Sequence, residues 1–276
     1  MTDEVHAAQP VSQSNVADNL LERPAAYSVI EEVFRIQETM EQQNALHRFF
    51  GFRPVHPHAQ SWFSGAIGEL KVAELLWQLG PEWAVLHAVP VGKDGSDIDH
   101  VVIGPAGVFT INTKRHPGKK IWVGERMLMV AGQKTDHLRN SRHEAKRAAR
   151  LLTTATGIPV DVHPILAIVE PGSFTFRQRP ADVMIMDARR LPRWLKRRRA
   201  VLAPEELARI IDAATDVRTW HPTAELSVDP TYLERFQVLQ RKDKQAYVIR
   251  LAWSLALAGA VGLGAVAVLT SFIPGF

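Results

Sequence analysis

Three polar side chains, Asp99, Asn112 and Lys114, interrupt two otherwise apolar runs of the sequence. The runs, residues 98–103 and 108–114, are rich in Val and Ile and are separated by the turn formers GPAG, which predicts a β-hairpin. Symmetric closure of the loop places Asp99 opposite Asn112, with their Cβ atoms roughly 5 Å apart. Side chains alternate along a strand, so Lys114 lies on the same face as Asn112.

Two kinds of chemistry explain such a triplet. Burying a carboxylate, an amide and an ammonium costs several kcal/mol unless something pairs them. Asp99 and Lys114 could form an ion pair at a solvated sheet edge. Alternatively, Asp99 could be an oxygen ligand of a divalent metal, with Lys114 stabilising negative charge that develops in a reaction.

A helix that precedes the hairpin carries a further acid, Glu69. We expect this helix over residues 65–79, with Ser64 as its N-cap, Gly80 as its end and Trp77 on its buried stripe. Glu69 is then either a metal ligand or an ordinary first-turn glutamate that complements the helix dipole.

The order of these elements resembles the nuclease-related domain, a branch of the PD-(D/E)XK or restriction-endonuclease-like superfamily, over residues 65–150. The resemblance rests on the SGAIGELKVAELLWQLG helix, the IDHVVIGPAGVF hairpin and the strand that ends at Lys114. In that superfamily the helix supplies a Glu, the first core strand an Asp, and the next strand an acid two residues before a Lys. Glu69, Asp99 and Lys114 match this pattern, whereas Asn112 stands where the family has the second strand's acid.

The resemblance implies an α/β fold with a central mixed sheet flanked by helices. It also implies phosphodiester hydrolysis with Mg²⁺ or Mn²⁺ held by Glu69, Asp99 and Asn112, and with Lys114 stabilising the transition state. An amide oxygen can coordinate Mg²⁺ but brings no charge. Two alternatives therefore stay open. One is a catalytically inactive nuclease-fold module that binds nucleic acid or protein partners at the membrane, and the other is a membrane-bound scaffold whose triplet is an ion pair.

Basic residues beyond the hairpin favour a polyanionic partner, as does the net charge of +4. A helix is expected over residues 136–153, and its basic residues recur at spacings of three and four, which predicts a shared cationic face rather than a merely solvated one. The residues expected to contact nucleic acid, DNA in preference to RNA, are Arg115, Lys134, Arg139, Arg142, Lys146 and Arg147. Gln133 is assigned a positioning role. The run 189–199, which includes Trp194, could bind nucleic acid or anionic lipid, or be a solvated charge run.

The chain of 276 residues is long enough for one main domain and an appendage. The absence of cysteine excludes disulfides, zinc ribbons and thiol nucleophiles. We expect a disordered N-terminus (1–24), an N-terminal helix and loop (25–60), the nuclease-related domain (61–215), a linker and stalk helix (216–250) and a transmembrane helix (251–273). Apolar runs predict strands over 83–91, 121–123, 127–130, 164–169 and 183–186, and helices over 25–50 and 204–214.

Residues 251–273 contain no charged residue or histidine. As a helix this stretch is about 34 Å long, enough to cross a bilayer. Basic residues, among them Lys244 and Arg250, precede it, so the positive-inside rule predicts a single-pass C-terminal anchor with the N-terminal domain in the cytoplasm. The first residues lack the pattern of a cleaved signal peptide.

Overall fold

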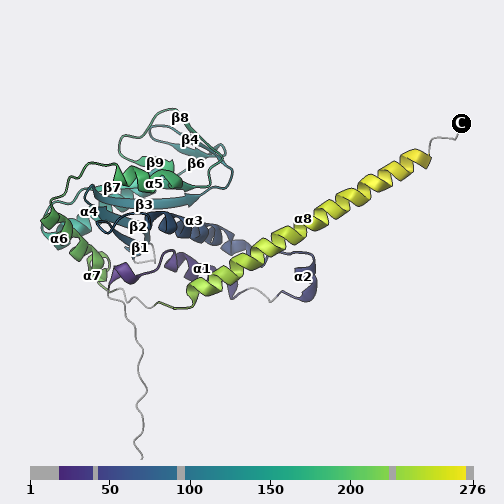
Figure 1. Cartoon of the computed structure of the whole chain (residues 1–276), viewed down its shortest axis with the longest axis horizontal. Coiled ribbons are helices and arrows are strands. Elements are labelled where there is room, and N and C mark those ends of the chain that lie inside the picture. Colours follow the sequence, from purple (N-terminus) through teal and green to yellow (C-terminus); the bar gives the residue numbers. More distant parts are fainter. Residues whose placement is uncertain (1–18, 40–42, 92–96, 224–227, 272–276) are drawn as a thin grey trace, which may run out of the picture.

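A computed structural model describes residues 19–39, 43–91, 97–223 and 228–271. At its centre is a five-stranded sheet (Figure 1). Its strands, in spatial order, are β1 (Ala84–Pro90), β2 (Asp97–Gly104), β3 (Gly107–Arg115), β7 (Val162–Val169) and β9 (Met184–Asp187). The first three pair antiparallel and the last two lie parallel to β3, so the sheet is mixed, as the resemblance predicts.

Helices cover both faces of this sheet because its strands carry apolar side chains on both sides. Val102 and Phe109 pack towards α3 (Gln60–Leu76) and α5 (Leu191–Lys196). Their neighbours Val101 and Val108 pack on the opposite face. That face is covered by α4 (His137–Thr156), α6 (Pro204–Thr215) and α7 (Val217–Trp220). The result is a three-layer α/β/α domain.

A second, smaller sheet extends the central one. Its order is β6 (Gln133–Thr135), β5 (Leu128–Val130), β4 (Lys120–Val123) and β8 (Ser173–Phe176). The parallel pair β3–β7 continues into the parallel pair β4–β8 through a close backbone contact. A Cβ added at Gly172 would lie 2.4 Å from the carbonyl oxygen of Gly118, so only glycine fits there. The sequence predicted β4 and β5 but neither β6 nor β8.

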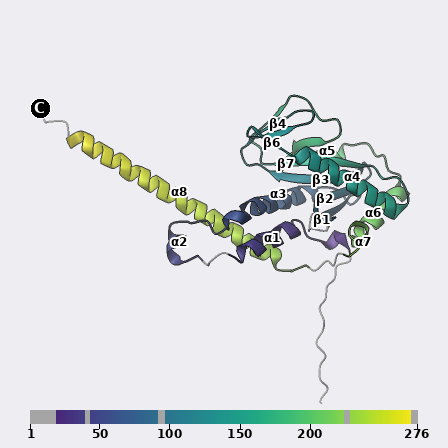
Figure 2. The same ribbon diagram turned by 180° about the vertical axis from the view of Figure 1, so that it is seen from behind.

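One continuous helix, α8 (Tyr232–Ser271), carries both the predicted stalk and the apolar segment. Its first turns complete a core with α1 (Tyr27–Gln37) and α3, in which Tyr232 and Phe236 are buried. Further along, α8 projects away from the domain (Figures 1 and 2). Within the described residues it is the one helix long and apolar enough to cross a membrane. The predicted end of the span, residues 272–273, lies outside the described part.

The N-terminal predictions need correction. Residues 1–18 of the predicted disordered segment lie outside the described residues, but residues 19–24 are ordered. A short 3-10 helix (Leu20–Glu22) buries Leu20 completely in the core. The helix predicted over 25–50 is two helices, α1 and α2 (Ala45–Phe49). Tertiary contacts made by α2, described below, override the continuous amphipathic pattern.

Two other boundaries also differ. Helix α3 begins at Gln60 after a 3-10 turn (Pro57–Ala59), so Ser64 is not its cap, and Trp77 is 84% exposed rather than buried. The segment predicted as a linker from residue 216 begins with α7, whose Trp220 is buried in the main core. The other predicted strands, and the helix over 204–214, are confirmed. A 3-10 turn (Ala188–Arg190) leads into α5.

Candidate active site

Asp99 lies where the backbone ladder of β2 is interrupted on both sides. The hairpin register runs as predicted from Gly104–Gly107 to His100–Ile111 and then stops. Pairing with β1 skips Asp99, and Ala88 of that strand has a left-handed backbone (φ 46°). The freed backbone N–H of Thr113 donates to the Asp99 carboxylate at 2.6 Å. Strained backbone beside a polar side chain is typical of functional sites.

Asn112 is buried and contacts an acid that the sequence analysis did not assign. Its Nδ2 donates to Glu144 Oε1 of α4 at 2.5 Å. Asn112 Oδ1 and Glu144 Oε2 are buried and have no hydrogen-bond partner among the described residues. Glu144 therefore brings to Asn112 the carboxylate that the second strand lacks.

A sequence signal for Glu144 exists, although it is weak. Glu144 lies three residues after Ser141 and four before Ala148, both of which are buried on α4. It is thus an acid on the apolar face of an otherwise basic helix. Burying a lone carboxylate there is costly unless it serves a site.

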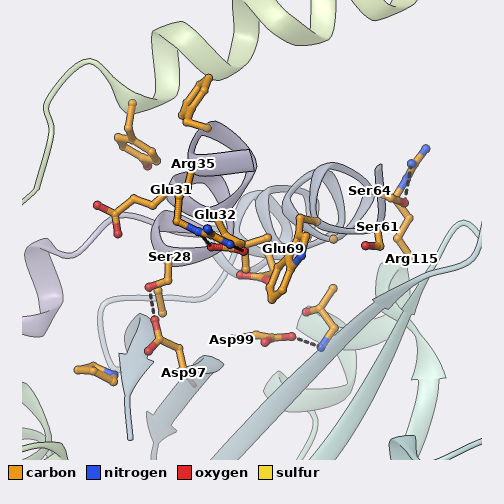
Figure 3. A pocket seen from close by; sticks show the side chains of 18 of the residues that line it. Ser28, Glu31, Glu32, Arg35, Ser61, Ser64, Glu69, Asp97, Asp99 and Arg115 are labelled. Atoms are coloured by element: carbon orange, nitrogen blue, oxygen red, sulfur yellow. Dashed lines mark hydrogen bonds and ion pairs between the residues drawn. The ribbon is translucent and has the colours of Figure 1, made fainter. Parts of the chain in front are cut away.

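Glu69 reaches the site from the other side of the sheet, on α3 (Figure 3). It is 6% exposed and lies well inside the helix, so the first-turn dipole explanation does not apply. The preceding residue, Gly68, lets α3 approach β3 closely. A Cβ added there would lie 3.1 Å from Arg115 Cβ and 3.4 Å from Thr113 Cγ2.

The two basic residues at the end of β3 differ in their contacts. Lys114 Nζ donates to the carbonyl oxygen of Thr113 at 2.9 Å, and its side chain lines the cleft. Arg115 also lines the cleft, but it forms an ion pair with Glu170 (Nε to Oε2, 2.8 Å) and donates to Ser64. Part of the Arg115 charge is therefore neutralised within the protein. Its predicted contact with nucleic acid stays a prediction.

The carboxylates of the site are short of positive charge. Burial raises the pKa of Glu69 well above its usual value, and the charge of Asp99 raises it further. Burial also raises the pKa of Asp99, although Lys114 and the Thr113 N–H oppose that shift. The pKa of Glu144 rises to about 8, first through burial and then through Asp99. Without another cation, Glu144 retains its proton at neutral pH.

Segments outside the hairpin complete a cleft of about 1520 Å³ around these residues. Asp97, just before the site, is held by Ser28 of α1 and by Arg23 (Nη2 to Oδ2, 3.3 Å). Figure 3 shows Glu32 and Arg35 of α1 above Glu69 and Asp99. The first turn of α8 also lines the cleft.

A histidine pair also lies at the cleft, and the sequence analysis did not assign it. His116 follows β3 and His137 begins α4; their Nε2 atoms are 3.4 Å apart and their rings are stacked. The pKa of His137 falls to about 4, chiefly through burial and then through Lys114. The pair is therefore uncharged at neutral pH.

The donor set fits a divalent cation with hard ligands. Mg²⁺ binds oxygen atoms and uses only one or two protein carboxylates, keeping several waters. No three His, Cys, Asp or Glu side chains within the described ranges form a metal site together. The predicted ligands Glu69, Asp99 and Asn112 offer two carboxylates and an amide oxygen. The unpartnered Asn112 Oδ1 and the excess of negative charge both favour a cation there.

The predicted cationic face of α4 does not border this cleft. Arg139, Arg142 and Lys146 share one side of the helix, whereas Glu144 lies on another. Arg142 pairs with Asp182 at 2.6 Å, so acidic partners are less scarce than the sequence implied. Arg139 also has an acidic partner in Asp136. The contact of these residues with nucleic acid stays a prediction, on a surface apart from the cleft.

The other predicted residues are dispersed. Arg147 lies nearer the side of Glu144, and its buried Nε has no hydrogen-bond partner among the described residues. Gln133 and Lys134 are exposed on β6 of the smaller sheet, away from the cleft lining. Trp194 packs edge-on against Phe109 (ring centroids 5.9 Å apart). In this arrangement it is a core contact rather than a platform for a base.

Comparison with known protein families matches residues 64–169 to the nuclease-related domain. The matched segment contains Glu69, Asp99, Asn112, Lys114 and Glu144. Among curated proteins, an uncharacterized protein of Bacillus anthracis is 40% identical over 68 residues. That similarity covers 23% of this chain and 32% of the relative, so the chain spans about a third of the relative's length. No solved structure matches the chain.

Proposed function

We propose that this chain, whose residues 64–169 form a nuclease-related domain, hydrolyses phosphodiester bonds of nucleic acid with the help of a divalent cation. The observation that supports this most directly is the contact between Asn112 and Glu144. It brings Glu144 into the cleft that Asp99 and Glu69 also line, and leaves two buried oxygen atoms without a partner among the described residues. Most buried polar atoms in folded proteins have a hydrogen-bond partner, so two unpartnered oxygen atoms side by side support a ligand at this point.

In this proposal Glu69, Asp99 and Asn112 hold Mg²⁺ or Mn²⁺, and Glu144 supplies the charge that Asn112 lacks. A bound divalent cation lowers the pKa of its water and neutralises phosphate charge. The Thr113 N–H orients the Asp99 carboxylate. Lys114, placed by the carbonyl oxygen of Thr113, stabilises the negative charge on the phosphate oxygens as the bond breaks.

We also propose that α8 anchors the domain to a membrane through residues 251–273. The basic residues before the apolar segment support a cytoplasmic domain in this proposal, by the positive-inside rule. DNA is the favoured substrate over RNA.

The test is plasmid nicking by the full chain in detergent micelles with Mg²⁺ or Mn²⁺. Asp99→Asn and Lys114→Met should each lose nicking, because each removes a group at the reacting phosphate. Asp161→Asn, a change at an exposed acid outside the cleft, is the matched control and should keep full activity. Equal nicking by Asp99→Asn and the parent chain would refute the assignment.

The binding module is the second candidate, since Asn112 supplies no charge to the site. It predicts salt-sensitive nucleic-acid binding without cleavage. Asn112→Asp separates the two functions. Activity gained only in this variant supports the binding module, whereas activity already present in the parent chain supports the enzyme.

A further inference from the structure

Apolar side chains cluster on the surface where α2 meets α8. We name this cluster, Leu46, Phe49, Phe50, Phe52 and Trp253, the aromatic foot. Each member is at least 42% exposed. The rings of Phe49 and Phe50 lie 5.2 and 5.6 Å from that of Trp253. Exposed apolar patches of this kind mark an interaction surface.

Backbone contacts fix the height of the foot along α8. Gly51 has a left-handed backbone (φ +72°), and a Cβ there would lie 2.6 Å from the carbonyl oxygen of Ala246. Arg250 Nη1 donates to the Gly51 carbonyl at 2.7 Å, and Trp253 Nε1 donates to the Phe49 carbonyl at 2.9 Å. Figures 1 and 2 show α2 beside α8, apart from the sheet.

That height coincides with the change from charged to apolar sequence on α8. Arg250 is the last charged residue before the apolar stretch, and Trp253 lies in the first turn of that stretch. From Leu251 to Val266 the side chains of α8 are exposed throughout. Aromatic side chains next to basic ones are typical of the level at which a protein crosses from water into lipid.

We propose that the aromatic foot inserts into the interface of the bilayer that α8 crosses. Its rings lie at the boundary of headgroups and acyl chains, and Arg48 and Arg250 face anionic headgroups. This inference rests on the proposed membrane anchoring. Arg53 holds the segment after α2 against α8 rather than facing lipid, because its Nε lies 3.2 Å from Oδ1 of Asp243 on α8.

The foot gives the domain a second attachment point beside the single helix, and this limits the tilt of the domain relative to the membrane. Arg235 of α8 lines the cleft, and Arg250 follows 15 residues later. At about 1.5 Å per residue the cleft is held roughly 22 Å from the membrane surface.

The absence of cysteine allows single-site spin labels on the full chain. The chain is reconstituted in vesicles of equimolar phosphatidylcholine and phosphatidylglycerol, with a nitroxide at Phe49→Cys or Phe52→Cys. Leu257→Cys, in the apolar segment, reports the span, and Trp77→Cys, an exposed aromatic position that directly follows α3, is the aqueous control. The measurement compares relaxation by oxygen, which partitions into lipid, with relaxation by a water-soluble nickel complex.

We expect oxygen to dominate at positions 49, 52 and 257 and nickel to dominate at position 77. Nickel dominance at 49 and 52 with oxygen dominance at 257 would overturn the foot while the anchor stands. Nickel dominance at 257 as well would overturn the anchor itself. Spin–spin broadening at 49 that disappears on dilution with unlabelled chain would assign the foot to a second copy of the protein instead.

Discussion

Glu144→Gln should make the metal-free protein more stable while weakening its response to Mg²⁺. The side chain keeps its length, and its amide oxygen can still accept from Asn112 Nδ2. What it loses is the carboxylate charge. Because burial and Asp99 raise the pKa of Glu144 to about 8, the folded metal-free protein holds a proton there at neutral pH.

The magnitude follows from linkage. The pKa rises from 4.5 when unfolded to about 8 when folded, so the folded state binds the extra proton. The contribution of Glu144 to the free energy of unfolding is therefore highest below pH 4.5 and falls as the pH rises towards 8. Each pKa unit is worth about 1.4 kcal/mol, so the loss at neutral pH is about 3 kcal/mol. Gln does not titrate, so the variant avoids this loss of about 3 kcal/mol. The difference corresponds to a rise in Tm of roughly 6–12 °C.

The assay is thermal unfolding of the full chain in detergent micelles with EDTA, at about pH 5 and about pH 7, followed by the same melts with Mg²⁺. The gain from Gln should be about 1 kcal/mol at the lower pH and about 3 kcal/mol at the higher one. Mg²⁺ should stabilise the parent chain more than the variant, because only in the parent does loss of the Glu144 proton add a negative charge beside the cation. Asp182→Asn is the matched control with the opposite sign, because Arg142 lowers the pKa of Asp182.

A Glu144→Gln chain that is less stable than the parent at about pH 7 without metal would refute this reasoning. The reasoning would also be refuted if the stabilisation by Glu144→Gln were the same at both pH values, because the stabilisation would then not come from the proton on the Glu144 carboxylate.

Three further predictions concern the framework of the site. Burial lowers the pKa of His87 from 6.5 to about 4, so its contribution to stability is complete above pH 6.5 and is lost as the pH falls towards 4. This His87 contribution should drop by about 2 kcal/mol between about pH 7 and pH 5, so in urea titrations the free energy of unfolding of His87→Gln relative to that of the parent chain should rise by that amount over the same range. Gly68→Ala should lower the free energy of unfolding by about 1–3 kcal/mol and reduce nicking, because α3 must move away from β3. Gly65→Ala is the control and should be tolerated, because a Cβ there would have its nearest neighbour at 3.8 Å. Equal melting temperatures of the two variants would contradict the close contact at Gly68. Arg23→Ala should lower the free energy of unfolding by about 3 kcal/mol, because it leaves the buried Asp97 carboxylate with Ser28 as its remaining partner. An unchanged Tm would show that the ion pair between Arg23 and Asp97 is not formed.

Local patterns in the sequence were enough to predict the hairpin and its turn. The alternation of apolar residues and the four-residue turn determine which residues of β2 and β3 face each other, because the side-chain period of a strand is two. The register was therefore predictable as far as His100 and Ile111, whereas the predicted facing of Asp99 and Asn112 is replaced by the bond from the Thr113 N–H to Asp99. The long apolar helix was equally accessible, since its length and lack of charge are properties of consecutive residues.

The contacts that complete the site depend on packing between distant segments, and no local pattern encodes them. Glu144 meets Asn112 across 32 positions and Arg23 meets Asp97 across 74, distances that only the stacking of helices on the sheet brings together. Packing also set the start of α3 and turned the basic face of α4 away from the cleft. In each case the local helix propensity, a few tenths of a kcal/mol per residue, was smaller than the free energy gained by burying apolar side chains against the sheet.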